Sequence, residues 1–326
     1  MTADMSSLLV VARRRLLTRD VCEFELRRAD NSALPPKEPG AHINVDTPSG
    51  ETRSYSLTGA VHDRSRHIIA VRRDEDGRGG SRSMVDEVAE GDELRVSLPH
   101  NDFALEDAPG YLLVAAGIGI TPIRAMALEL RRRGIRDVQL VYLSRSPEET
   151  PYLDELQTLL ATDEPGAIIV HHRREHGAFD WWPLLEHPAQ RRLYVCGPLA
   201  LQSELRALTM HWRPSRVHME NFAGVSAFGE ISLPFRAVWQ PKGAEFSGSV
   251  DVTVPAGQTF LSALRAEDID VASSCESGTC GTCRLRLIAG EADHRDVVLT
   301  EQERAHYVMP CVSRARSDVL VVAPLS

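Results

Sequence analysis

Residues 275–283 read Cys275-Glu276-Ser277-Gly278-Thr279-Cys280-Gly281-Thr282-Cys283, and a fourth cysteine, Cys311, follows on a separate segment. This C-x4-C-x2-C spacing with a distant fourth cysteine is the ligand pattern of a plant-type [2Fe–2S] cluster. The small residues between the cysteines leave room for backbone N–H groups to point at cluster sulfurs. A structural zinc site is the alternative, but it normally uses two separated C-x2–4-C arms. A disulfide pair is disfavoured by four cysteines around one compact loop. The sequence therefore predicts an iron–sulfur centre ligated by Cys275, Cys280, Cys283 and Cys311.

Length and composition are those of a globular protein with two or three domains. The 326 residues are 43% hydrophobic and 25% charged, which is ordinary for such a protein. A net charge of −9 argues against nucleic-acid binding, because nucleic-acid binders carry a basic footprint. No apolar run approaches the roughly 18 residues of a membrane span, and the run at 8–12 precedes its arginines, the wrong order for a signal peptide. The remaining cysteines, Cys22 and Cys196, are far apart, which suits a reducing compartment. We expect a cytoplasmic monomer without membrane or nucleic-acid contacts.

Residues 1–106 carry short alternating hydrophobic runs separated by turns, which predicts an antiparallel β-barrel. In Arg53-Ser54-Tyr55-Ser56-Leu57, the period of two puts Arg53 and Tyr55 on one side of a strand. The stretch 77–83 is a glycine-rich loop that can wrap a phosphate just before a helix predicted over 84–88. Taken alone, each motif is more often an ordinary surface strand or turn.

From residue 107 to 224 the pattern changes to a parallel α/β sheet, with its site at the carboxyl ends of the strands. The continuous apolar run 111–116 indicates a strand buried on both faces. It leads into Gly117-Ile118-Gly119-Ile120-Thr121-Pro122 and a helix predicted over 123–133. Gly117 and Gly119 let the backbone approach a pyrophosphate at the positive end of that helix, and Thr121 can cap it. The motif is only moderately specific, because Pro122 replaces the third glycine of the common dinucleotide fingerprint.

A linker is predicted over 225–236, and residues 237–326 resemble a β-grasp ferredoxin domain. Short strands are expected over 235–240, 249–254, 285–289 and 319–323, with a helix over 259–266 before the cysteine loop. The predicted fold is thus multidomain, with a barrel, a parallel α/β domain and a ferredoxin-like domain in that order.

The ordered motifs R-S-Y-S, G-R-G-G-S, G-I-G-I-T-P, C-G-P and C-x4-C-x2-C resemble the phthalate dioxygenase reductase family, within the ferredoxin–NAD(P)⁺ reductase class, over nearly the whole chain. The resemblance implies a flavin-binding barrel and a nicotinamide-binding α/β domain, with FMN rather than FAD. It further implies that Cys275 and Cys280 bind one iron, and Cys283 and Cys311 the other. The FMN contacts that it implies are Arg53, Tyr55, Ser56, Val71, Arg72, Gly79, Gly80, Ser81, Thr121 and Phe222. Phe222 would cover the flavin ring, or else it is an ordinary core or linker aromatic.

The same resemblance implies where NAD(P) binds, at Gly117, Gly119, Thr121, Ser144, Arg145, Cys196, Gly197 and Pro198. Ser144 and Arg145 follow the second parallel strand, where an adenosine ribose is normally bound. Arg145 could accept a 2′-phosphate, yet no second basic residue follows it and Glu148-Glu149 would repel a 2′-phosphate. This favours NADH and leaves NADPH open. Cys196 either faces the nicotinamide or is a buried, inert thiol.

Electron counting connects these parts. NAD(P)H delivers two electrons as hydride, whereas a [2Fe–2S] cluster accepts one electron at a time. A flavin between them has to take up the electron pair and release its electrons singly. The hypothesis is an oxidoreductase that passes electrons from NADH through FMN and the cluster to a partner terminal oxygenase, such as an aromatic-ring dioxygenase, a demethylase or a related monooxygenase. Ser56 and Cys196 would lie at the reacting groups. One alternative is an electron carrier or redox sensor without rapid NAD(P)H turnover. A second alternative, a flavohaem enzyme, is disfavoured because it would need a haem domain, for which no residues remain.

Overall fold

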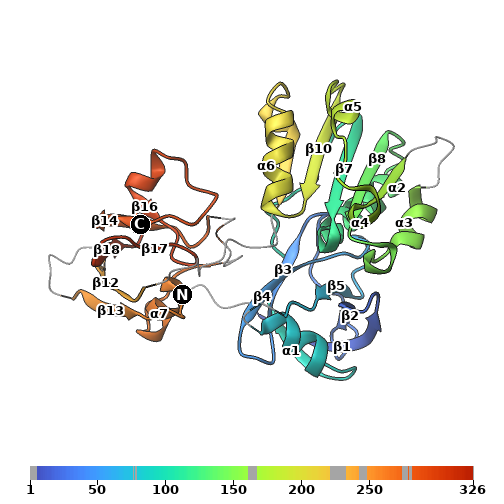
Figure 1. Cartoon of the computed structure of the whole chain (residues 1–326). Coiled ribbons are helices and arrows are strands. Elements are labelled where there is room, and N and C mark those ends of the chain that lie inside the picture. The colour runs from blue at the N-terminus through green and yellow to red at the C-terminus, as the bar shows by residue number, and fades with distance from the viewer. Residues whose placement is uncertain are drawn as a thin grey trace. The chain divides into compact units, whose positions relative to one another are not determined.

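The computed structural model describes residues 6–75, 77, 79–160, 167–220, 233–241, 248–273, 278 and 281–325. The chain divides into two compact units, Met1–Phe222 and Ala223–Ser326 (Figure 1). Three residues with predicted roles, Phe222, Cys275 and Cys280, lie outside the described residues. Within the described ranges, every helix is too short or too polar to traverse a lipid bilayer.

The first part of unit 1 is the predicted antiparallel barrel. Its six-stranded sheet has the order β4-β3-β6-β1-β2-β5, and the two end strands lie next to each other. The core is formed by the inward side chains of these strands, including Phe24, Ile43 and Ile69, which are completely buried. The strands are β1 Ser7–Leu16, β2 Val21–Arg27, β3 His42–Asp46, β4 Thr52–Ser56, β5 His67–Arg72 and β6 Glu93–Val96.

Two features of the barrel differ from the prediction. Strand β1 was not predicted, because a bulge between Val11 and Arg13 interrupts its alternation and Arg13 to Arg15 are exposed. The helix expected over 84–88 begins earlier, as α1 Gly80–Glu87 beside β4 and β5. Gly79 precedes it in the left-handed conformation, with φ of 95°, which glycine adopts without steric cost. Gly80 and Ser81 therefore belong to the first turn of a helix rather than to a loop.

The second part of unit 1 is a parallel sheet of order β11-β10-β7-β8-β9. Alternate residues of β7 face opposite sides: Tyr111 and Leu113 pack with α2 and α3, whereas Leu112 and Val114 pack with α5 and α6. Both faces are covered, as expected for parallel strands with apolar runs. The strands are β7 Gly110–Ala116, β8 Val138–Ser144, β9 Ile168–His172, β10 Arg191–Cys196 and β11 Val217–Glu220. The helices are α2 Ile120–Arg132, α3 Leu153–Leu160, α4 Arg173–His176, α5 Trp182–Leu185 and α6 Leu199–Leu208, with short 3-10 turns η1 Gly117–Gly119, η2 Pro147–Glu149 and η3 Pro214–Arg216.

The capping role predicted for Thr121 is wrong. Helix α2 begins at Ile120 after the turn η1, so its N-cap is Gly119, and no side chain caps it. Thr121 instead lies inside the first turn, where its Oγ1 donates to the carbonyl of Ile118 at 3.0 Å. If the Thr121 hydroxyl capped α2, the helix would begin at Pro122. After the 3-10 turn it begins two residues earlier, at Ile120.

Unit 2 has the predicted β-grasp character. Its five-stranded sheet has the order β13-β12-β18-β14-β16, in which β12 and β18 are parallel, and the helix α7 packs against it. Thr259 caps α7, because its side chain accepts from Ser262 N at 3.0 Å. The elements are β12 Phe235–Trp239, β13 Val250–Val254, α7 Phe260–Ala266, β14 Leu285–Ala289, β15 Ala292–Asp293, η4 Glu303–Ala305, β16 Tyr307–Val308, β17 Arg314–Ala315 and β18 Val319–Ala323.

Candidate functional site

A corner with several hydrogen-bond donors lies where β4 meets the start of α1. A Cβ atom on Gly80 would lie 3.0 Å from both Cγ and Nε of Arg53, so glycine lets the arginine lie directly against the first turn. Arg53 is held there by an ion pair of 2.7 Å from its Nη1 to Oε2 of Glu51. The N–H groups at a helix start and a guanidinium beside them are the donors that a phosphate needs. This corner unites Arg53 with Gly79, Gly80 and Ser81.

Next to this corner, two buried hydroxyls have no hydrogen-bond partner. They are Tyr55 Oη and Ser56 Oγ, in consecutive residues of β4. Burial raises the pKa of Tyr55 above its ordinary value, so its hydroxyl stays protonated and can donate. A buried polar group left unsatisfied costs about 1–3 kcal/mol, and such a group in a native protein calls for a ligand or water. A flavin mononucleotide, with a phosphate and a polar ring system, fits this donor set.

Two further residues implied for the flavin lie on β5. Val71 is 1% exposed and belongs to the barrel core. Arg72 reaches the second part of unit 1, since its Nη1 lies 4.0 Å from the place that a Cβ on Gly117 would take. Arg72 therefore brings a cation from the barrel to the glycine turn that follows β7.

That glycine turn contacts the end of β10. Gly117 has a left-handed φ of 54°. A Cβ on Gly119 would lie 2.2 Å from the carbonyl oxygen of Cys196, and one on Gly197 would lie 2.9 Å from Cβ of Ala116. Gly119 and Gly197 thus permit an approach that any side chain would prevent, and Pro198 follows as the N-cap of α6. The structure therefore brings the predicted coenzyme residues on these two loops together.

Cys196 itself is completely buried. Its Sγ lies 3.8 Å from Oε2 of Glu220, the residue that pairs with Cys196 on the neighbouring strand β11. Burial raises the pKa of the Cys196 thiol well above its ordinary value, and the Glu220 carboxylate adds to the rise. The thiol is therefore neutral near pH 7 and is not a nucleophile. Glu220 was not among the predicted site residues, because strand β11 had not been expected.

At the ends of β8 and β9, a second arginine that does not follow Arg145 in the sequence lies beside it in the structure. The backbone N–H of Arg174, on α4, donates to the carbonyl of Arg145 at 3.2 Å. Ser144 lies beside them, with its Oγ 2.7 Å from Oγ1 of Thr150 and 2.8 Å from Nδ1 of His172. Because the carboxyl ends of parallel strands lie at one edge of the sheet, a basic residue just after the next strand, such as Arg174, could have been expected near Arg145.

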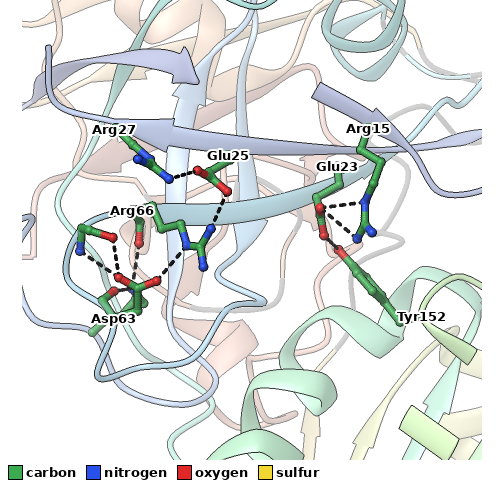
Figure 2. A network of polar contacts seen from close by, with 9 residues as sticks. Arg15, Glu23, Glu25, Arg27, Asp63, Arg66 and Tyr152 are labelled. Carbon is green, nitrogen blue, oxygen red and sulfur yellow. Dashed lines mark hydrogen bonds and ion pairs between the residues drawn. The ribbon is translucent and has the colours of Figure 1, made fainter. Parts of the chain in front are cut away.

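Buried polar contacts that the sequence did not reveal connect the barrel to the α/β part (Figure 2). Tyr152 Oη donates to Oε2 of Glu23 on β2, and Glu23 also accepts from Arg15. On the barrel side, Glu25 pairs with Arg27 and Arg66. The Tyr152–Glu23 and Arg66–Glu25 contacts join segments that are distant in sequence, so no local motif predicts them.

In unit 2, the described cysteines predicted as ligands, Cys283 and Cys311, are 2% and 1% exposed, and neither forms a disulfide. A Cβ on Gly278, which has a φ of 74°, would lie 2.6 Å from Cγ2 of Val312. Gly278 therefore packs against Val312, the residue that follows Cys311. Asp296, which is 3% exposed, supports the same region, because its Oδ2 accepts from Leu299 N at 2.8 Å while Val297 N donates to the carbonyl of Gly278. Two buried thiols next to a glycine-bearing loop fit a thiolate-ligated cluster.

Comparisons with known proteins agree with this arrangement. A family model described as a 2Fe-2S iron-sulfur cluster binding domain matches residues 245–316. Phthalate dioxygenase reductase of Burkholderia cepacia is 43% identical over 96% of both chains. Vanillate O-demethylase oxidoreductase of Pseudomonas putida is 36% identical over 96% of this chain and 98% of its own.

Solved structures give the same result. A structure described as phthalate dioxygenase reductase, a modular structure for electron transfer from pyridine nucleotides to [2Fe-2S], matches 98% of both chains with a TM-score of 0.86 and 41% identity. An intact type IV self-sufficient cytochrome P450 monooxygenase matches 98% of this chain and 41% of its own, with a TM-score of 0.72 and 37% identity. The order of motifs, the three large sheets and the identity over almost the full length lead to one conclusion: the chain belongs to the phthalate dioxygenase reductase family.

Proposed function

We propose that this chain passes electrons from NADH through FMN and a [2Fe–2S] cluster to a partner oxygenase. As a member of its family, it is an NAD(P)H-dependent flavin and iron–sulfur oxidoreductase, the reductase component of a multicomponent oxygenase. The proposed modules are an FMN-binding barrel at 1–106, a nicotinamide-binding part at 107–224, a linker at 225–236 and a ferredoxin domain at 237–326. The flavin, when bound, supplies the conversion from a hydride to single electrons.

The proposed binding of FMN begins at its phosphate. Arg53 and the backbone of Gly79, Gly80 and Ser81 would hold the phosphate, because a guanidinium and a helix start lie together there. Tyr55 and Ser56 would give their buried hydroxyls to the rest of the flavin, with Ser56 at the reacting edge of the ring. Val71, Arg72, Thr121 and Phe222 would also contact the flavin, as the family resemblance implies.

The proposed nicotinamide site needs no acid or base. Gly117 and Gly119 would admit the pyrophosphate at the start of α2, while Ser144 and Arg145 would contact the adenosine ribose. Cys196, whose thiol is neutral, would shape the pocket for the nicotinamide together with Gly197 and Pro198. Its contribution is to position the ring and exclude water rather than to move a proton.

The cluster would be held by four thiolates. Cys283 and Cys311 are buried in the core of unit 2, and Cys275 and Cys280 complete the spacing. We assign one iron to Cys275 and Cys280 and the other to Cys283 and Cys311. The electron acceptor would be a terminal oxygenase of the kinds that the relatives' names indicate, a dioxygenase, monooxygenase or demethylase system. A cytoplasmic monomer is proposed with it.

The observation that carries this proposal is the pair of unpartnered hydroxyls on β4 beside a cation from β5 that reaches Gly117. It supports a ligand site in the barrel next to the turn proposed for the pyrophosphate. The test is to mix purified protein anaerobically with NADH and to follow the flavin absorbance. Bleaching within one turnover is expected, and flavin extracted from the protein should be FMN. Flavin that NADH does not bleach would support the electron-carrier alternative, and extracted FAD would contradict the assignment of the phosphate corner.

A further inference from the structure

A carboxylate lies among arginines at the edge of the parallel sheet. The Glu149 side chain is 9% exposed. Its Oε1 lies 2.9 Å from Nη1 of Arg174 and 3.4 Å from Nη2 of Arg19, and its Oε2 lies 3.7 Å from Nη1 of Arg145. The three arginines come from different segments: the turn after β1, the loop after β8 and the helix α4 after β9. Sequence alone had suggested that Glu148-Glu149 would repel a 2′-phosphate beside a single arginine; the structure shows several arginines converging on Glu149.

The position of this cluster relates it to the coenzyme. Arg145 directly follows β8, and Arg174 follows β9 and bonds to the Arg145 backbone. In parallel nucleotide-binding sheets, the adenosine ribose lies at the end of the strand after the glycine turn, where an acidic residue binds the 2′-hydroxyl of NAD or an arginine accommodates the 2′-phosphate of NADP. Here both kinds of residue are present, and they are paired with each other.

Two guanidinium groups that converge on a carboxylate have the geometry that also binds a phosphate. We propose that Glu149 occupies the place of the 2′-phosphate and thereby selects NADH over NADPH. Its carboxylate accepts from the ribose 2′-hydroxyl and repels the 2′-phosphate dianion, while it keeps Arg145 and Arg174 engaged. Without that charge the same arginines form a phosphate site. This inference rests on the coenzyme site proposed above.

The direct test is Glu149→Gln, which keeps the shape of the side chain and removes its charge. Flavin reduction by NADPH should become about 10- to 100-fold more efficient in kcat/KM, the range expected when a phosphate gains charge-assisted hydrogen bonds. The affinity for adenosine 2′,5′-bisphosphate, measured by calorimetry, should rise by a similar factor, while that for AMP should change little.

The matched control is Glu148→Gln. Glu148 is the exposed neighbour, and it accepts from Ser146 Oγ at 2.7 Å. The substitution Glu148→Gln removes the same charge one residue away, so it should leave kcat/KM for NADPH within about threefold of the wild-type value. The double variant Glu149→Gln, Arg174→Gln should lose the gain in both NADPH use and bisphosphate affinity.

The outcomes separate the two proposals. If NADH bleaches the flavin of the wild type but Glu149→Gln gains neither NADPH use nor bisphosphate affinity, the role of Glu149 is wrong and the coenzyme site stands. An equal gain in NADPH use by Glu148→Gln would also overturn the role of Glu149, because the loss of any nearby negative charge would then explain the gain. If neither coenzyme bleaches the wild-type flavin, the proposed function itself fails. Should Glu149→Gln not fold, Arg174→Gln alone decides: it should weaken the bisphosphate more than AMP, and equal weakening of both contradicts the proposal.

Discussion

Tyr152 Oη donates a 2.7 Å hydrogen bond to Oε2 of Glu23, and so connects the segment before α3 to strand β2 of the barrel (Figure 2). The ring of Tyr152 in turn lies under Arg124, whose guanidinium carbon is 4.5 Å from the ring centre. Arg124 Nη1 donates to the carbonyl of Thr58 at 2.5 Å. Thr58 lies two residues beyond Ser56. Helix α2, which begins at the turn proposed to bind the coenzyme, is thus hydrogen-bonded to the segment just after the strand proposed to hold the flavin.

This connection makes Arg124 a positioning residue. Arg124→Met should lower the rate of flavin reduction by NADH about tenfold, because a misplacement of about 1 Å between reacting groups is enough for a loss of that order or more. NADH affinity should change little, since the side chain of Arg124 contacts Thr58, Tyr152 and Glu155 rather than the side chains proposed to bind the coenzyme. Stopped-flow absorbance over a range of NADH concentrations separates the two quantities.

The matched control for Arg124→Met is Glu155→Gln. Glu155 is the other partner of the Arg124 side chain, and its own side chain is 40% exposed. It leaves the hydrogen bond to Thr58 in place, so the reduction rate should stay within about twofold of the wild type. A wild-type rate in Arg124→Met would show that this connection does not position the reactants.

Arg53→Ala tests the phosphate corner. Loss of the guanidinium should weaken FMN binding by about 10- to 100-fold, the value of a charge-assisted hydrogen bond to phosphate. Fluorescence of FMN released on dilution measures the affinity. Arg13→Ala, on the exposed face of β1, removes a cation elsewhere and should leave FMN affinity unchanged. Equal affinity in Arg53→Ala and the wild type is the result that this assignment does not allow.

Cys311→Ser tests the ligand set. Replacing one of four thiolates should abolish or severely reduce the iron content and the paramagnetic signal of the reduced cluster, while FMN content stays near one per chain. Cys22→Ala is the control, because Cys22 is a buried barrel cysteine outside the predicted ligands. Full iron content in Cys311→Ser would remove Cys311 from the ligand set.

The buried His67 predicts a pH dependence of stability. It is 1% exposed, and burial, with a contribution from Lys37, lowers its pKa from 6.5 to about 4. Between these pH values the unfolded chain binds more protons at this residue than the folded chain. The neutral His67 therefore contributes its full share to the free energy of unfolding above pH 6.5, and this share is lost as the pH falls towards 4. The loss amounts to about 2–3 kcal/mol.

Urea unfolding of the wild type and His67→Gln at several pH values measures that contribution. The free energy of unfolding of the wild type should fall more steeply between pH 7 and pH 4 than that of the variant. Parallel curves would mean that His67 does not titrate in this window. The carboxylates that titrate at lower pH are common to both proteins and cancel in the difference.

The parts of the fold that the sequence predicted are those set by local pattern. The apolar run 111–116 could be identified because a strand buried on both faces needs no alternation, and the cysteine loop because metal ligands impose a spacing. Strand β1 escaped prediction because the bulge after Val11 shifts its alternation. Helix α1 was expected too late, because its first turn contains Gly80, Ser81 and Ser83, which have lower helix propensity than the residues that follow.

The site residues that escaped prediction are set by tertiary structure. Arg174 reaches Arg145 only because β8 and β9 end side by side. Arg124 and Tyr152 act on the barrel across an interface that no local motif encodes. Their charges and ring are common on protein surfaces, so residue type alone could not single them out.

The most direct test of the account is an anaerobic titration of the purified holoprotein with NADH, followed by absorbance and by electron paramagnetic resonance. FMN accepts two electrons and a [2Fe–2S] cluster one, so full reduction should require about one and a half NADH per chain, with the flavin bleached and the cluster signal developed. An endpoint near one NADH with no cluster signal, in protein with a full complement of iron, would contradict a path from NADH through the flavin to the cluster.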